Sequence, residues 1–149
     1  MKVFIVFMAI FVIHVSFLSY QGDMGRYVQS RNFLKATAEE CAAGAALYYD
    51  REAYGQGNFH FSYEEGKQYI EYILEHGMAA APLPQGSRIS YEVVFQDDHL
   101  GYENDPESDE RNNIPSVTVT LNAKTQDLFA LPFFEVTEIT RAARYELPQ

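Results

Sequence analysis

The side chains of this sequence best suited to chemistry are the carboxylates between positions 96 and 113. This segment reads QDDHLGYENDPESDERNN, and its Asp105, Glu107 and Asp109 alternate along the chain. Alternate spacing can bring three carboxylates together, and Ca²⁺ binds about six to eight oxygen ligands of this kind. The glycine of an EF-hand loop is absent, however, and Pro106 stiffens the backbone. We therefore expect a solvated loop between two strands, with a Ca²⁺ site at these three residues as the alternative.

The histidines, the cysteine and the hydroxyl side chains form no catalytic set that the sequence reveals. No two of the four histidines have the spacing of an HExxH zinc site, and no Gly-x-Ser-x-Gly or phosphate-binding loop occurs. Cys41 is the only cysteine, which excludes an internal disulfide. It lies on the apolar side of a predicted helix, which predicts a packed side chain, and an intermolecular disulfide is the alternative. We expect no enzymatic activity and no cofactor other than the possible Ca²⁺.

The composition indicates one acidic domain with a separate apolar block. The chain has 149 residues, which lies in the range of a single domain. It carries 21 acidic residues against 11 Lys and Arg, for a net charge of −10, so it lacks the basic face that nucleic-acid phosphates require. Hydrophobic residues make up 47% of the chain, and a dense block of them occupies residues 3–20. We expect membrane lipid, and no nucleic acid, among the partners.

That block, Val3–Tyr20, predicts a membrane-spanning helix. Its eighteen residues rise about 27 Å as a helix, close to the hydrocarbon thickness of about 30 Å. A cleaved signal peptide is the competing interpretation, since Lys2 supplies the basic start of one. The small residues of a cleavage site are missing: cleavage after Ser19 leaves Phe17 three residues before the cut. We therefore expect a retained anchor over residues 1–22.

The helix is predicted to continue beyond the membrane as a stalk over residues 23–54, because no proline precedes Pro82. Positions spaced alternately by three and four form a largely apolar seam, and an overlapping row of alanines would let another backbone approach closely. The seam is Met24, Tyr27, Arg31, Leu34, Ala38, Cys41, Ala45 and Tyr48. The predicted helix-packing residues are Gly25, Leu34, Ala38, Ala42 and Ala46. They pack either on the head of the same chain or against neighbouring copies.

Residues 55–149 predict an α+β head. A capping box at Ser62 and Glu65 precedes a second helix over residues 63–76. Alternating patterns predict strands, listed last, that form a three- to four-stranded antiparallel sheet with helices on one face. The apolar loop Leu128–Phe134 either covers the sheet or contacts a membrane or partner. The predicted strands are Arg88–Phe95, Ser116–Asn122 and Glu135–Tyr145.

The segment Asp23-Met24-Gly25-Arg26-Tyr27, with Arg31, Leu34 and the Ala-rich stretch to Ala46, resembles the TadE/TadG-like family. These are minor pilins or pseudopilins of tight-adherence (Flp-type) pilus systems. The likeness covers about residues 10–50, and the C-terminal order of strand, hydrophobic loop and last strand resembles the family as well. The chain departs from type IV-like prepilins, because the processing Gly and the Glu early in the mature helix are absent before His14.

The resemblance implies a pilin-like fold with a family motif at Asp23, Gly25 and Arg26. It also implies other pilin-like subunits and pilus or secretion platform proteins as partners, and it allows homo-oligomers. The basic residues that flank the anchor, counted alone, favour a cytoplasmic head. The acidity of the head and the resemblance favour an extracytoplasmic one, which we expect. The expected function is assembly of, or minor-subunit membership in, a surface pilus or related secretion filament. The alternative is a secreted small acidic binding domain that has lost residues 1 to about 20.

Overall fold

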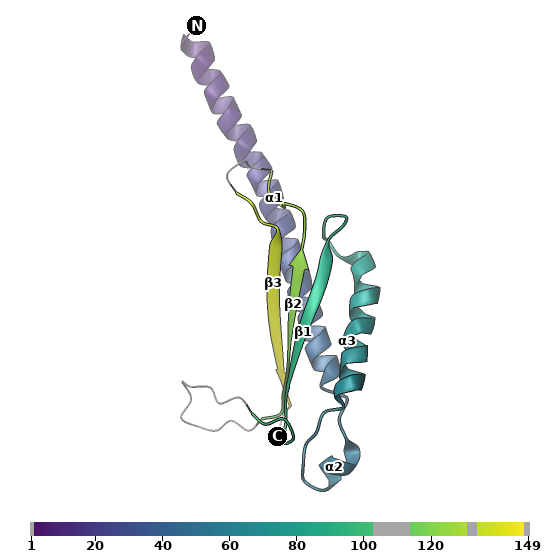
Figure 1. Ribbon diagram of the computed structural model, residues 1–149. Helices are drawn as coiled ribbons and strands as arrows, with labels where there is room; N and C mark the ends of the chain where they lie inside the picture. The colour runs from purple at the N-terminus through teal and green to yellow at the C-terminus, as the bar shows by residue number, and fades with distance from the viewer. Residues whose placement is uncertain (1, 103–113, 131–133, 148–149) are drawn as a thin grey trace, which may run out of the picture.

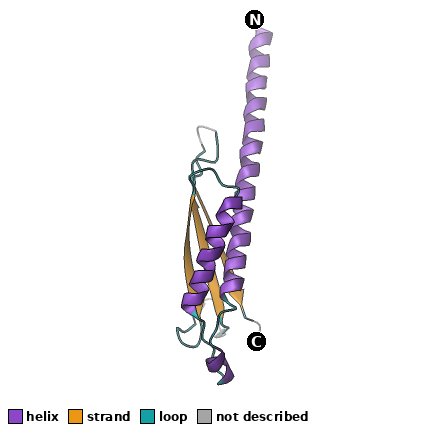
Figure 2. Cartoon of the chain, turned by 90° about the vertical axis from the view of Figure 1, so that its right-hand side faces the viewer, coloured by secondary structure: helices purple, strands orange, loops and turns teal. Residues whose placement is uncertain are grey.

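A single long helix runs through most of the length of the molecule. The computed structural model describes residues 2–102, 114–130 and 134–147. Its helix α1, Lys2–Ala45, has 44 residues and rises about 66 Å. The N-terminal half of α1 projects away from the rest of the chain, and the C-terminal half lies beside a β-sheet (Figures 1 and 2). The predicted α+β arrangement of a long N-terminal helix and a small head is confirmed.

The stalk helix ends at Ala45, so its predicted continuation to residue 54 is wrong. The carboxylate of Asp50 accepts the backbone N–H groups of Glu52 and Ala53 at 2.8 and 3.3 Å. This cap starts the separate short helix α2, Arg51–Gly55. The turn before α2 is also held by a β-bridge between Tyr49 and Phe61. A local cap and a contact with a later segment therefore stop the helix where its composition alone would allow it to continue.

In the part of the head that the structure describes, three strands form an antiparallel sheet in the order β1-β2-β3. Strand β1 is Arg88–Gln96, β2 is Ser116–Lys124 and β3 is Glu138–Glu146. The first two were predicted to within two residues, whereas β3 begins three residues later than predicted. The backbone just before β3 is hydrogen-bonded to a loop instead: Thr125 N–H donates to Thr137 O and Leu128 N–H to Val136 O.

One face of the sheet forms the core and the other faces solvent. The alternation in β2 places Val117, Val119, Leu121 and Ala123 on the inner face, where all four are fully buried. Helix α1 packs over β2 and β3, and helix α3, Tyr63–Gly77, packs over β1. Figure 2 shows both helices on the same side of the sheet. The opposite face carries polar side chains such as Asn122, which bonds Thr140 and Glu138 of the neighbouring strand.

Helix α3 begins at the predicted residue without the predicted capping box. Ser62 is its N-cap, but the Ser62 side chain makes no capping hydrogen bond. The backbone of Ser62 is engaged elsewhere, because its N–H donates to Tyr48 O at 2.8 Å. That bond ties the start of α3 to the segment that follows α1, so a contact with a distant part of the chain takes the place of the local capping box.

Two glycines allow close packing around α3: Gly44 of α1 leaves room for Tyr69 of α3, and Gly66 of α3 leaves room for Phe95 of β1. A Cβ atom on Gly44 of α1 would lie 2.0 Å from a ring carbon of Tyr69 on α3, and a Cβ atom on Gly66 would lie 3.1 Å from the ring of Phe95. The Tyr69 ring also contacts Tyr48, at a centroid distance of 5.8 Å. The ring therefore has a neighbour on each side, and a larger residue at position 44 would have to displace it.

We expect Gly44→Ala to lower the free energy of unfolding by about 1 kcal/mol, because overpacking costs about 1–3 kcal/mol and the gain in helix propensity offsets about 1. Gly25→Ala is the matched control: this glycine lies in the same helix, and a Cβ there meets nothing within 4 Å. The control should be neutral or more stable. Thermal unfolding of both variants in detergent, followed by circular dichroism, measures the difference, and equal melting temperatures would contradict the close approach.

Candidate functional site at the junction of anchor and head

The N-terminal part of α1 has no packing partner among the residues that the structure describes. Its large apolar side chains from Val3 to Leu18 are exposed, and Val3 is 84% accessible. This helix is long and apolar enough to span a membrane, and a signal sequence of this kind would meet the same criteria. Contact with the head begins at Tyr20, which packs against the core of the head. The junction between the two parts of α1 therefore lies at residues 20–27.

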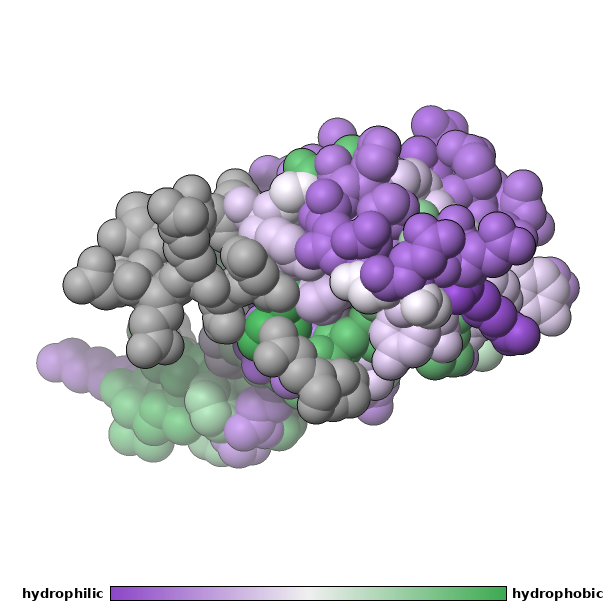
Figure 3. Space-filling view, turned by 90° about the horizontal axis from the view of Figure 1, so that it is seen from below, coloured by the Kyte–Doolittle hydropathy of each residue, from purple (hydrophilic) through white to green (hydrophobic). Residues whose placement is uncertain are grey.

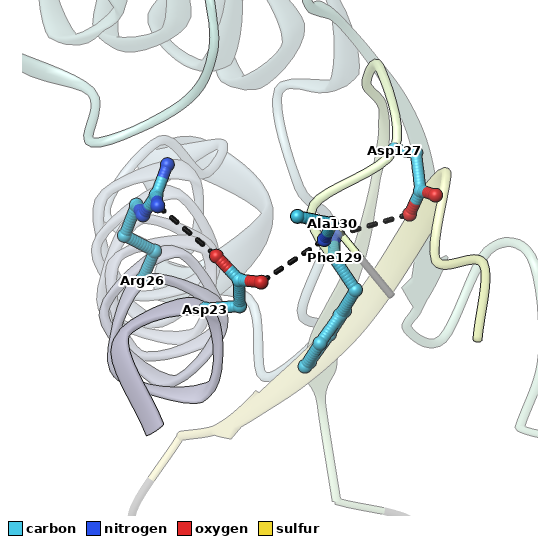
Figure 4. Close-up of polar contacts among 5 residues, drawn as sticks. All are labelled: Asp23, Arg26, Asp127, Phe129 and Ala130. Carbon is cyan, nitrogen blue, oxygen red and sulfur yellow. Dashed lines mark hydrogen bonds and ion pairs between the residues drawn. The ribbon is translucent and has the colours of Figure 1, made fainter. Parts of the chain in front are cut away.

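The first fully packed polar residue of α1 is Asp23, at 3% exposure. One carboxylate oxygen accepts the backbone N–H of Ala130 at 3.0 Å, and the other accepts Arg26 Nη2 at 3.0 Å. Figure 4 shows the carboxylate between these two donors, which come from the helix and from the loop after β2. A buried carboxylate is costly unless it is paired and hydrogen-bonded, and here both oxygens have partners.

The loop after β2 is itself organised by a second carboxylate. Asp127 Oδ1 accepts the backbone N–H groups of Phe129 and Val136 at 3.1 and 3.0 Å, which closes the loop on itself. The Phe129 ring is thereby directed at α1, where it lies 5.9 Å from the Tyr20 ring and 6.1 Å from the Tyr27 ring between centroids. Phe129 is 3% exposed. The loop and the helix thus share an aromatic contact and a polar one.

We call Asp23, Arg26, Asp127, Phe129 and Ala130 the junction clamp. The clamp joins segments 107 residues apart in the sequence. Its two carboxylates are occupied by backbone N–H groups and an arginine, so the arrangement is suited to fixing the loop on the helix. The structure brings two of the three motif residues, Asp23 and Arg26, into the clamp, whereas Gly25 is exposed with open space around it.

The predicted helix-packing residues divide between two environments. Leu34, Ala38, Ala42 and Ala46 are fully buried against the head of the same chain. A neighbouring copy cannot contact side chains that are already covered, so this row supports the first of the two alternatives. Gly25 alone lies on the free surface of α1.

Two residues of the predicted seam are exposed. Tyr48 lies after the end of α1. Arg31 lies within the helix but faces outward, and the neighbouring Ser30 is buried in its place. The hydroxyl of Ser30 donates to Pro82 O at 2.6 Å, which holds the connector that follows α3. The three-four spacing of apolar residues could not predict that Ser30 is buried. A serine is buried only where its hydroxyl has a hydrogen-bond partner, and that partner, Pro82 O, is distant in the sequence.

A second carboxylate cluster holds the opposite end of the head. Asp97 follows β1 and is fully buried. Oδ2 accepts Phe61 N–H at 2.9 Å and the Tyr63 hydroxyl at 2.7 Å, and Oδ1 accepts the N–H groups of His99 and Leu100 at 3.1 and 2.8 Å. The sequence predicted a solvated loop from residue 96 onward, which is wrong for Asp97.

These contacts determine the protonation of Asp97 and Tyr63. Burial alone would raise the pKa of Asp97, but the four hydrogen bonds outweigh it and hold the pKa below the ordinary value. Burial, with the hydrogen bond to Asp97, raises the pKa of the Tyr63 hydroxyl. Asp97 is therefore an ionised acceptor and Tyr63 a protonated donor at neutral pH.

The remaining candidates for chemistry are not brought together. The possible Ca²⁺ ligands Asp105, Glu107 and Asp109 lie outside the described residues. Among the residues that the structure describes, no group of three His, Cys, Asp or Glu side chains could hold a metal ion. Cys41 is fully buried, and burial, with the nearby Glu40 charge, raises the pKa of its thiol to about 11. The predicted packed cysteine is confirmed, and its burial leaves no access for an intermolecular disulfide.

No protein-family model, no curated protein and no solved structure matches the chain. The interpretation of the junction clamp therefore depends on its geometry alone.

Asp23→Ala should lower the free energy of unfolding by about 2 kcal/mol, because it leaves the Ala130 N–H without its acceptor and removes a charge-assisted hydrogen bond. Glu39→Ala is the control: its carboxylate also faces a basic residue one turn away, Lys35 at 3.7 Å, but both side chains are exposed. That pair should contribute no more than about 0.5 kcal/mol. Chemical unfolding in detergent measures both values, and amide exchange at Ala130 should accelerate only in the Asp23 variant. Equal losses would contradict the clamp.

The lowered pKa of Asp97 predicts an acid-sensitive head. A carboxyl whose pKa is lower in the folded than in the unfolded state stabilises the folded protein. This stabilisation is complete above the unfolded-state pKa of about 3.9 and is lost as the pH falls through the folded-state pKa. Asp97→Asn should lower stability at pH 7 by about 3 kcal/mol, because an amide N–H₂ must then face a donor. It should also flatten the dependence of stability on pH in the acid range. Glu92→Gln, on the exposed face of β1, should leave both unchanged.

Proposed function

We propose that this chain is a membrane-anchored pilin-like protein that acts in assembly of a surface pilus or related secretion filament, or is a minor subunit of one. The observation that carries the proposal is that one unbroken helix supplies both an exposed apolar segment, residues 3–18, and the central element of a folded head. An apolar surface of this length has to be covered by lipid or by the helices of other subunits. The likeness of the Asp23-x-Gly25-Arg26 segment to TadE/TadG-like proteins agrees with this use.

The head is the part that we place outside the cytoplasm. The end of the head opposite the N-terminus carries mainly hydrophilic residues in Figure 3, and the hydrophobic residues gather along the receding helix. The chain is then amphipathic along its length, as a single-pass protein requires. In this arrangement the exposed side of α1 near Gly25, and not the buried alanine row, is available to other subunits.

The alternative is a secreted acidic binding domain from which residues 1 to about 20 have been removed. One observation supports this alternative. The first residue of α1 that packs against the core of the head is Tyr20, so the loss of residues 1–19 would remove no part of that core. A mature protein near the full mass of 17.0 kDa in the membrane fraction supports the anchor, and a soluble product about 2 kDa smaller supports the alternative.

The deciding experiment separates the anchor from the head in the native host. Deletion of this chain should reduce surface filaments, counted by electron microscopy of sheared cells, and the full chain should restore them. A cleavable secretion signal joined to residues 20–149 exports the head alone, and on our proposal it should not restore filaments. Full restoration by the head alone would establish the secreted alternative, and unchanged filaments after deletion would overturn the pilus assignment.

A further inference from the structure

We infer that the head rests on the surface of the bilayer that holds its anchor, with Phe134 in the interfacial layer of the lipid. The inference relies on the proposed membrane anchor and goes beyond it, because it assigns a lipid contact to a segment more than a hundred residues from the anchor in sequence. It also assigns a contact to the exposed part of the apolar loop Leu128–Phe134. The sequence predicts that this loop either covers the sheet or contacts a membrane or partner.

The length of the anchor determines where the lipid surface lies. The apolar stretch of α1 from Val3 to Tyr20 rises about 27 Å, slightly less than the hydrocarbon thickness of about 30 Å. The anchor therefore has no excess length, and its last apolar residues must reach the edge of the hydrocarbon. Tyr20 is then at the interface, where aromatic side chains are enriched.

The loop after β2 lies at this same level. The ring of Phe129 lies between Tyr20 and Tyr27, which are about 10 Å apart along the helix axis. The ring of Phe134 contacts Phe129 edge-on, at a centroid distance of 5.0 Å. Figure 1 shows the described residues that follow β2 and precede β3 beside α1, at the end of the sheet nearer the N-terminal half of the helix. Phe134 is therefore within two ring contacts of the residue that marks the bilayer edge.

The loop covers the head with one part and leaves another part uncovered. Leu128 and Phe129 are buried and belong to the core, as the first of the two predicted uses requires. Phe134 is 49% exposed, although the clamp holds the loop against α1 through Asp23 and Asp127. On α1 beside the clamp, an open apolar groove of about 540 Å³ continues the hydrophobic surface of the anchor toward Val28. The exposed ring of Phe134 therefore lies near the level of Tyr20, to which Phe129 connects it.

The charges at this end of the head do not require an anionic lipid. The membrane-facing edge of the sheet pairs Arg88 with Lys124 and Lys124 with Glu138, so both signs are present. Arg26, with an exposed guanidinium group, lies nearby on α1, and Glu135 follows Phe134. The contact therefore depends on aromatic and apolar area, and it should form on zwitterionic lipid.

The absence of tryptophan from the chain allows a direct test. Phe134→Trp in the full chain, reconstituted in phosphatidylcholine vesicles, places a single fluorescent probe at the proposed contact. Lipids brominated near the headgroup should quench it at least about twofold. Leu100→Trp is the matched control, since Leu100 is also apolar and exposed but lies at the far end of the head, and it should not be quenched.

A third variant separates this inference from the anchor itself. Phe11→Trp lies within the anchor and should be quenched most by lipids brominated deep in the acyl chains. If Phe11→Trp is quenched and Phe134→Trp behaves like Leu100→Trp, the head does not touch the bilayer although the anchor spans it. A blue-shifted but unquenched Phe134→Trp would mean that protein covers the site, which also overturns the inference. If Phe11→Trp is unquenched, the membrane anchor fails. Glu135→Trp, one residue along and exposed, supplies a second probe if Phe134→Trp unfolds.

Discussion

The rest of the structure depends on one constraint: a single helix has to be stable in two different surroundings. Residues 3–18 of α1 expose apolar side chains on every side, whereas residues 34–45 bury small ones against a sheet and a second helix. The change occurs at Asp23, where a carboxylate is buried because Ala130 and Arg26 satisfy it. This carboxylate is satisfied only beside the folded head, so it marks where the exposed apolar part of the helix ends.

Because α1 is continuous, the orientation of its N-terminal half also fixes the orientation of the head. No loop separates the exposed apolar part of α1 from the part that packs in the head, so the two parts share one direction. The head reinforces this by packing α3 across α1 at Gly44, where the ring of Tyr69 occupies the space of a side chain, and by fixing the loop after β2 at the junction clamp. The head therefore has little freedom to turn about the helix axis, and the same loop always lies toward the N-terminal half of α1.

The sequence predicts the parts of this fold that depend on local periodicity. The alternation of Val117, Val119 and Leu121 predicts β2, and the apolar block predicts the N-terminal half of α1, because each pattern follows from one element's own geometry. The parts that depend on distant partners could not be predicted. The carboxylate of Asp23 accepts the backbone N–H of Ala130, and that of Asp97 accepts the backbone N–H of Phe61. A sequence motif cannot identify such partners, because every residue except proline has a backbone N–H. The end of α1 is likewise decided by the pairing of Tyr49 with Phe61.

The hydrogen bonds of the junction clamp and of Asp97 show that some of the acidic residues have a structural role. A net charge of −10 suggests a head whose carboxylates only keep it in solution, but Asp23, Asp97 and Asp127 each accept at least one backbone N–H from another part of the chain or hold a loop closed. Small domains that must fix several loops often do so with disulfides. The only cysteine of this chain is buried in the core, so no disulfide is available. Carboxylate-to-backbone bonds at the two ends of the head perform that cross-linking, which makes part of the acidity a requirement of the fold.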